Sequence, residues 1–289
     1  MFDVRCSFFK YWLQVERYLQ QIISAKSRVK WIYFIPLSAM GIALLIGAFK
    51  YLHLGDLLGG FQKSSDGIIQ GDLLINFYLF SIVVISSKLS GLSLSDIGLS
   101  LKDIKHAILI TSVYFILFNV ITIILSIVFH KDILVEYDLI KQNANCVIGE
   151  AISQFFGNAL FEEVFWRGFL LVQLAKVFHK ITKKTIPALA VSAIIGSVIF
   201  AYGHSHGGGF EGLGMERSFA LIVSGISFCV MYLLFNNVFS IIGIHAITNI
   251  SYIMSVNGFV FMAYYRGYIS LVLGIILAIY YAQESKRRL

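Results

Sequence analysis

Charged residues are scarce in this chain, and so are prolines and cysteines. Asp, Glu, Lys and Arg together make up 13% of the 289 residues, about half of the roughly 25% that is usual for soluble domains. A water-soluble fold of this length could not cover its surface with so few charges, so the composition excludes a soluble enzyme. A hydrophobic content of 58% also excludes a disordered protein. A multi-spanning membrane protein remains.

The shortage of proline and cysteine narrows the class further. With two prolines and no shift in composition, nothing marks a linker, so residues 31–289 are expected to form a single membrane domain behind a leader, residues 1–30. The cysteines are Cys6, Cys146 and Cys229. Because they are odd in number and scattered, they form neither a disulfide framework nor a metal knuckle and fit small apolar core positions.

Eight apolar stretches approach the length of a membrane span, which is about 20 helical residues for a bilayer core about 30 Å thick. The second is short, and the fourth is too long for one perpendicular crossing, which indicates tilt or a part in the headgroup region. The sequence therefore predicts an all-α polytopic membrane protein with about eight transmembrane helices. The stretches are Trp31–Leu52, Leu73–Ser87, Ala107–Phe129, Gly149–Val177, Pro187–His204, Phe219–Phe235, Val238–Val256 and Tyr268–Ala282.

The leader before the first span mixes aromatic residues with basic ones such as Lys10, Arg17 and Lys26. This mixture is typical of an amphipathic helix that lies in the membrane interface. An ordinary charged tail is an equally good interpretation.

The basic residues assign the two sides of the membrane. With eight spans, the segments on the side of both termini hold sixteen Lys and Arg residues, and the opposite loops hold six. The positive-inside rule then predicts that both termini are cytoplasmic. This distribution also accounts for the net charge of +7, so no nucleic acid partner is expected.

Several ionisable side chains fall inside the predicted spans. Glu162, Glu163 and Arg167 lie in the fourth, His204 at the end of the fifth, and His245 in the seventh. A charged group at the centre of a helix in the bilayer costs roughly 2.5–3.5 kcal/mol on insertion scales, so its presence is by default a functional hypothesis.

The spacing of the three charges in the fourth span separates their roles. Glu163 and Arg167 are four residues apart and share one helix face, where they can form an ion pair that lowers the cost of burial. Glu162 is rotated by about 100° and has no charge partner in its own helix. A carboxylate in apolar surroundings is a stronger base than one in water, which suits it to general-base catalysis.

Two other spans carry polar residues at helical spacing. His245 and Asn249 are four apart, and Phe200 is one turn before His204. If these helix faces meet Glu162, they enclose a base that can activate water and donors that can stabilise an oxyanion. This set of groups is typical of a hydrolase active site. For each of these histidines and for Asn249 taken singly, a purely structural role, in which the side chain hydrogen-bonds one helix to another, is about as probable as a catalytic one. Counting residues from the ends of the predicted spans places His204 and His245 at different depths in the membrane. The two can meet at one site only if a span boundary or a helix tilt differs from this assignment.

In this order, the groups Glu162-Glu163-(three residues)-Arg167, Phe200-(three)-His204 and His245-(three)-Asn249 resemble the three motifs of the CAAX-protease and bacteriocin-processing family. This is the type II CAAX prenyl endopeptidase group of membrane-embedded proteases. The motifs lie within residues 149–256.

The resemblance implies a role for each of these residues. Glu162 would activate the attacking water with help from His204, and Glu163 with Arg167 would be a structural pair. His245 and Asn249 would form the oxyanion hole. Phe200 would orient or pack against His204.

The resemblance implies no required cofactor, with zinc as the alternative. Glu162, His204 and His245 could supply three of the about four ligands that zinc needs. The metal-free interpretation is favoured because two of these residues are then also needed as catalytic donors.

The leading functional hypothesis is an endopeptidase that acts on a peptide or lipid-modified protein in a bacterial cell membrane, in peptide maturation or bacteriocin self-immunity. The expected partners are this substrate and membrane lipids; the oligomeric state does not follow from the sequence. A non-catalytic scaffold or regulator that keeps the protease fold is the second hypothesis. A small transporter is a third, which is disfavoured because the two halves carry no matching broken helices.

Overall fold

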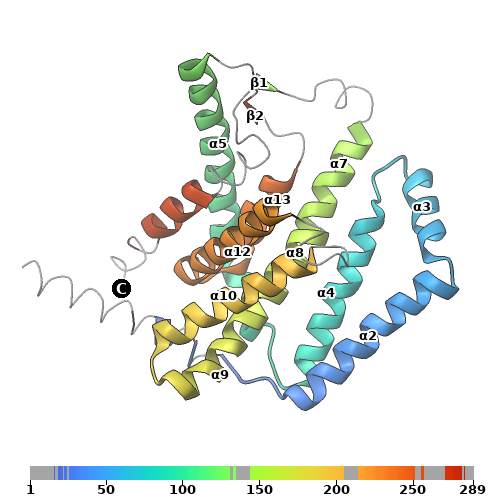
Figure 1. Ribbon diagram of the computed structural model, residues 1–289. Helices are drawn as coiled ribbons and strands as arrows, with labels where there is room; N and C mark the ends of the chain where they lie inside the picture. Colours follow the sequence, from blue (N-terminus) through green and yellow to red (C-terminus); the bar gives the residue numbers. More distant parts are fainter. Residues whose placement is uncertain are drawn as a thin grey trace, which may run out of the picture.

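The computed structural model describes residues 16, 19–21, 23–24, 26–130, 133–134, 144–204, 214–250, 255–256, 271–281 and 283, and almost all of this part is helical (Figure 1). Each of the eight predicted stretches contains a helix, and the predicted all-α polytopic fold is confirmed. The described elements are α2 (Trp31–Tyr51), α3 (Leu54–Ser64), α4 (Gly71–Leu89), η1 (Ser95–Ile97), η2 (Leu101–Asp103), α5 (Ile104–Phe129), β1 (Ile133–Leu134), α7 (Ala144–Ser153), η3 (Gln154–Asn158), α8 (Ala159–Glu163), η4 (Val164–Leu171), α9 (Val172–Thr182), α10 (Thr185–Gly203), α12 (Met215–Phe235), α13 (Val238–Asn249), β2 (Ser255–Val256) and a helix over Leu271–Tyr281.

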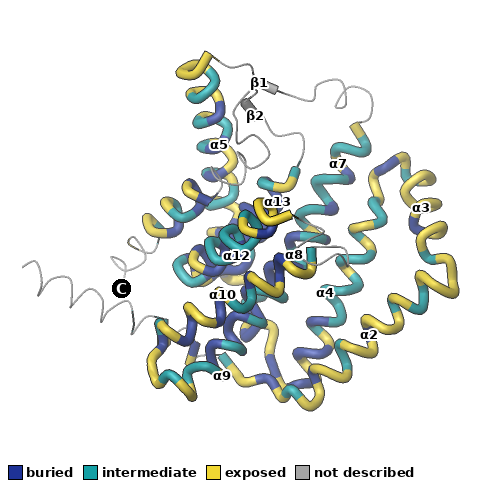
Figure 2. The backbone as a smooth tube through the Cα atoms, in the orientation of Figure 1, coloured by how far each residue is buried: buried dark blue, intermediate teal, exposed yellow. Residues whose placement is uncertain are grey.

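Five of the described helices are long and apolar enough to cross a membrane, namely α2, α4, α5, α10 and α12. Their outer faces expose large apolar side chains, for example Ile32, which is 77% exposed, and Ile127, which is 68% exposed. Exposed residues follow α2 and α3 over most of their lengths (Figure 2). A contiguous apolar surface of this kind is unfavourable in water and favourable against lipid tails, so the protein is an integral membrane protein.

The predicted fourth span is part of a longer helical run, from Ala144 to Thr182, which forms α7, η3, α8, η4 and α9 in succession. η3 and η4 are π-helical, so the backbone is wider on both sides of the single α-helical turn of α8. Such π segments are rare and are frequently found at functional sites. A regular α-helix was expected here, because hydropathy and spacing do not distinguish π from α turns.

This run lies in the middle of the molecule (Figure 1). It packs against α4 on one side and against α10, α12 and α13 on the other, while α5 covers α13. The buried core between these helices includes Phe118, Val164, Met231 and Ile244. The central position of the run brings its charged residues into the protein interior and away from lipid.

Gly168 allows η4 to approach the segment before α5 closely. A Cβ atom at this position would lie 2.2 Å from the carbonyl oxygen of Ile97 in η1. No side chain other than hydrogen fits there without a shift of backbone. Gly168 directly follows Arg167, so this contact also fixes the helix beside the buried charges.

We therefore expect Gly168→Ala to lower the free energy of unfolding by about 1–3 kcal/mol, the usual cost of overpacking. The measurement is thermal unfolding of the detergent-solubilised protein. Gly196→Ala is the matched control, because a Cβ atom at Gly196, in α10, meets no other group within 4 Å. Equal unfolding temperatures for the two variants would contradict the close contact.

The predicted seventh span, Val238–Val256, is wrong at its second boundary. α13 ends at Asn249, and Ile250 is already extended with ψ 121°, while Ser255 and Val256 pair with β1 in a two-residue ladder. A helix of 12 residues is about 18 Å long and too short for a bilayer core of about 30 Å. Hydropathy recorded that the segment is apolar but could not show where the helix stops.

The turn before α13 agrees with the expected Asn236–Asn237 connection. Asn236 ends α12 with φ 49°, in the left-handed region that Asn tolerates. The side chain of Asn237 then caps α13 by accepting hydrogen bonds from the amides of Phe239 at 2.9 Å and Ser240 at 3.4 Å. This cap fixes where α13 begins and hence where His245 lies.

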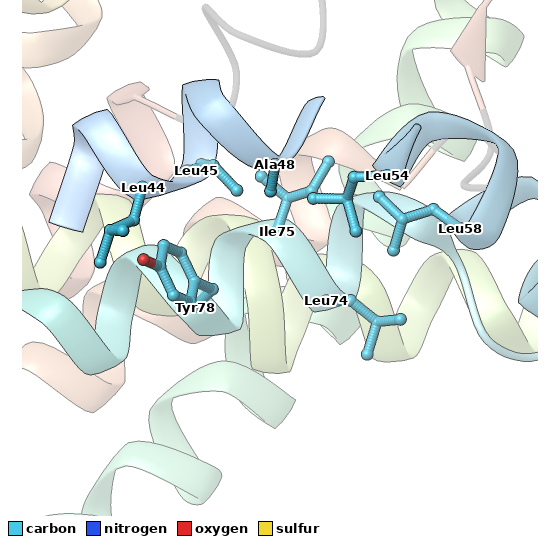
Figure 3. Close-up of a pocket in the computed structure, with 8 residues that line it drawn as sticks. All are labelled: Leu44, Leu45, Ala48, Leu54, Leu58, Leu74, Ile75 and Tyr78. Atoms are coloured by element: carbon cyan, nitrogen blue, oxygen red, sulfur yellow. The ribbon is translucent and has the colours of Figure 1, made fainter. Parts of the chain in front are cut away.

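An apolar groove of about 330 Å³ opens between α2, α3 and α4. Figure 3 shows the side chains that line it, among them Leu44, Leu58, Leu74 and Tyr78. The hydroxyl of Tyr78 donates to the carbonyl oxygen of Gly41 at 2.9 Å and so pins α4 to α2. The groove belongs to the outer layer of helices, and α4 separates it from the central run.

Most of the predicted interfacial leader lies outside the described residues. Within it, residues 16, 19–21 and 23–24 are helical.

Candidate active site

Glu162 is at the centre of the candidate site. It lies in α8 and is 8% exposed. Its Oε1 is 3.6 Å from Nε2 of His204, at the end of α10, and its Oε2 is 3.8 Å from Nε2 of His245 in α13. The three helices thus bring together the acid and both imidazoles that were predicted from separate spans.

The spacing at Glu162 leaves room between the groups. Both distances exceed the limit of about 3.2 Å for a good direct hydrogen bond, and Oε2 of Glu162 accepts no hydrogen bond from the described residues. Polar groups at this separation suit a small bridging molecule such as water.

Glu163 is fully buried, and one of its carboxylate oxygens contacts two side chains. Its Oε1 accepts a hydrogen bond from Nη1 of Arg167 at 2.8 Å, which is the predicted pair on one helix face. The same oxygen is 2.6 Å from Nδ1 of His245. This contact between helices could not be predicted, because spacing within one helix carries no information about a neighbouring helix.

The hydrogen bonds of the two histidines orient their rings. A carboxylate only accepts, so Nδ1 of His245 donates to Glu163 and Nε2 is the atom that faces Glu162. For His204, Nδ1 donates to the carbonyl oxygen of Phe200 at 2.9 Å, and Nε2 again faces Glu162. Such partners fix both the tautomer and the direction of an imidazole.

Aromatic rings enclose the buried charges. The guanidinium of Arg167 lies 5.1 Å from the ring centres of both Phe200 and Phe228, a favourable position for a cation. Phe228 also stacks on His245 at 5.0 Å, and Phe200 contacts His204 at 4.3 Å. Phe200 therefore packs against His204 as expected, whereas no signal in the sequence indicated Phe228.

Asn249 lies at the rim of the site and is exposed. Its Nδ2 donates to Oε1 of Gln154 in η3 at 3.1 Å, and Nδ2 of Asn158 donates to the same oxygen at 3.4 Å. The hydrogen bond from Asn249 to Gln154 holds α13 to the central run. Gln154 was not predicted, although it precedes Glu162 by eight residues, which is the spacing of one helix face.

The side chain of His204 is 35% exposed, whereas that of Glu162 is 10% exposed. The predicted zinc ligands are the same Glu162, His204 and His245. Among the described residues, however, no three His, Cys, Asp or Glu side chains have the spacing of a metal site.

The arrangement agrees with a known family. Residues 144–251 match the Type II CAAX prenyl endopeptidase Rce1-like family. The resemblance predicted from the motifs is thereby confirmed. The match covers less than half of the chain, but it contains Glu162, Glu163, Arg167 and both histidines.

The Rce1-like segment begins where α7 begins and ends just after α13. It therefore includes the entire central helical run and every helix that contributes a side chain to the site. No curated protein and no solved structure matches the chain. The family that this segment matches is one of membrane endopeptidases.

Proposed function

We propose that this protein is a membrane-embedded endopeptidase in which Glu162 activates a water molecule for attack on a peptide bond. The observation that carries the proposal is the buried Glu162 carboxylate between two Nε2 atoms at 3.6 and 3.8 Å. The match to a family of endopeptidases over the same residues supports it.

In the proposed reaction, Glu162 accepts a proton from water while the water oxygen attacks the carbonyl carbon of the substrate. His204 accepts from the same water through Nε2 and so orients it. His245, protonated and balanced by Glu163, donates through Nε2 to the developing oxyanion, and Asn249 supplies a second donor. The proton on Glu162 then passes to the nitrogen that leaves when the C–N bond breaks.

The proposed substrate is a peptide or a lipid-modified protein in a bacterial cell membrane, where the enzyme would act in peptide maturation or bacteriocin self-immunity. We propose that the N-terminal segment and the end of α9 are cytoplasmic, because residues 1–30 and 176–185 together hold ten of the 23 Lys and Arg residues.

A comparison of the peptides released in membranes separates this enzyme from a non-catalytic scaffold. Membranes that contain the wild-type chain are compared with membranes that contain Glu162→Gln, which keeps the shape of the side chain and removes the base. Peptides that appear only with the wild type support proteolysis. Identical peptides together with an unchanged biological output would favour the scaffold.

The proposed reaction has no step through a metal ion; among the described residues, no group of three His, Cys, Asp or Glu side chains was found that could hold one. Zinc bound there would act as a Lewis acid on the carbonyl oxygen. We expect a strong chelator to leave the rate of cleavage by the purified protein unchanged. A loss of activity that added zinc restores would contradict the metal-free reaction and make these residues ligands.

A further inference from the structure

A second polar region lies at the far end of the central helical run, where residues 26–30 cross α9. Two cavities of about 160 Å³ each lie side by side there, and both have Arg28 and Lys176 in their walls. His179 also lines the first cavity, and Lys180 also lines the second. Each cavity has about five times the volume that a water molecule occupies in the liquid, roughly 30 Å³, which is space for a phosphate group.

The backbone segment that carries Arg28 is fixed on α9 by hydrogen bonds to the residues on either side of Arg28. Oε1 of Gln173 accepts from the amide of Val29 at 3.1 Å, and Nε2 of Gln173 donates to the carbonyl oxygen of Ser27 at 3.1 Å. Nζ of Lys176 donates to the carbonyl oxygen of Lys26. These hydrogen bonds fix the backbone on both sides of Arg28, so the walls of the cavities are held in place.

The acid beside this region is already engaged. Asp96 is 6% exposed and accepts hydrogen bonds from the amides of Ser27 at 2.5 Å and Ser93 at 2.8 Å. Burial, helped by the positive charge of Lys176 and opposed by the negative charge of Asp96, lowers the pKa of Lys26 to about 8. At the cavities themselves, Arg28 and Lys176 repel each other, and in the part of the chain that the structure describes no carboxylate forms an ion pair with Arg28, Lys176 or Lys180.

The position of the cavities along the helices corresponds to the membrane interface. Trp31, the first residue of the α2 span, lines the second cavity, and tryptophan is enriched at the level of the headgroups. On α9, Val177 is 41% exposed and Ile181 is 73% exposed. Val177 and Ile181 are four residues apart and form an apolar strip on one face of α9. Lys176 and Lys180 are also four apart and lie beside this strip.

We propose that Arg28, Lys176 and Lys180 bind the phosphate of an anionic membrane phospholipid, with an acyl chain along Val177 and Ile181. Guanidinium and ammonium groups are the donors that phosphate oxygens prefer, and basic pockets between spans on the cytoplasmic side bind lipid headgroups. The bound lipid holds residues 26–30 to α9. Because α9 continues the helix that carries Glu162, this lipid stabilises the central run.

The test uses the purified full-length protein in a neutral detergent with added phosphatidylglycerol or phosphatidylcholine. The variant Arg28→Gln/Lys180→Gln removes two exposed charges from the cavities and leaves the buried Lys176 in place. The control Lys50→Gln/Lys63→Gln removes two exposed charges from α2 and α3. Retained lipid is counted by mass spectrometry of the intact protein, and stability is followed by thermal unfolding.

We expect phosphatidylglycerol to raise the unfolding temperature of the wild type and the control more than phosphatidylcholine does. The Arg28→Gln/Lys180→Gln variant should bind phosphatidylglycerol on the order of 10-fold more weakly and lose this extra rise, although its unfolding temperature without lipid stays that of the wild type. Equal binding by both variants would overturn the proposal. Stabilisation by inorganic phosphate alone, equal to that by the lipid, would overturn the assignment to a lipid. Neither readout depends on peptide cleavage.

Discussion

Glu162→Gln is expected to lower the rate of peptide cleavage by the purified protein by about 10²–10⁴-fold, the usual contribution of a general base. Gln fills the same space between His204 and His245 but does not accept a proton from water at neutral pH. The measurement is cleavage of a substrate peptide by protein in detergent or liposomes. The unfolding temperature is expected to remain near that of the wild type, since Glu162 has no partner closer than 3.6 Å in the described structure.

Glu216→Gln is the matched control for this experiment. Glu216 is an exposed glutamate in the first turn of α12, so its substitution makes the same chemical change outside the site. We expect this variant to cleave at the rate of the wild type. Wild-type activity in Glu162→Gln would show that another group activates the water and would end the proposed reaction.

Arg167→Met is expected to destabilise the protein by about 3–5 kcal/mol, the cost of removing one partner of a buried ion pair. Arg167 is 1% exposed and Glu163 is fully buried, so the remaining carboxylate has no solvent to compensate for the lost guanidinium. Met fills much of the space between Phe200 and Phe228, so the effect is chiefly one of charge. The measurement is thermal or denaturant unfolding together with the yield of folded protein.

The double variant Glu163→Gln/Arg167→Met separates charge from packing. It removes both members of the buried Glu163–Arg167 ion pair, so we expect it to recover much of the stability that Arg167→Met loses. It should not recover cleavage, because His245 then lacks the carboxylate 2.6 Å from its Nδ1 that orients its ring and balances its charge. If the double variant is as unstable as Arg167→Met, the loss comes from packing and the charge argument fails.

The pair Glu163 and Arg167 illustrates what local spacing predicts well. Residues four apart on a helix are neighbours whatever surrounds the helix, and the structure places the two atoms 2.8 Å apart even though a π segment begins at Val164. In the same way, the contact of Phe200 with His204 follows from one turn of α10. These relations lie within single helices.

Relations between helices could not be predicted from spacing. That Nδ1 of His245 bonds to Glu163 while its Nε2 faces Glu162 depends on how α13 packs on α8. The bond from Asn249 to Gln154 and the ring of Phe228 over His245 have the same origin. The depth conflict between His204 and His245 also arose here, because hydropathy treated the short α13 as a full span.

The amino-acid sequence by itself determined that this protein lies in a membrane, that it is helical, and which charged residues have a neighbour within their own helix. These properties depend on composition and on a repeat of 3.6 residues, and both are local. The tertiary structure alone decided that Glu162 meets two imidazole nitrogens, that Glu163 serves both Arg167 and His245, and that the basic cavities form where residues 26–30 cross α9. The physical reason is that these contacts depend on the packing of helices far apart in the sequence, and a Cβ atom too many, as at Gly168, would displace them.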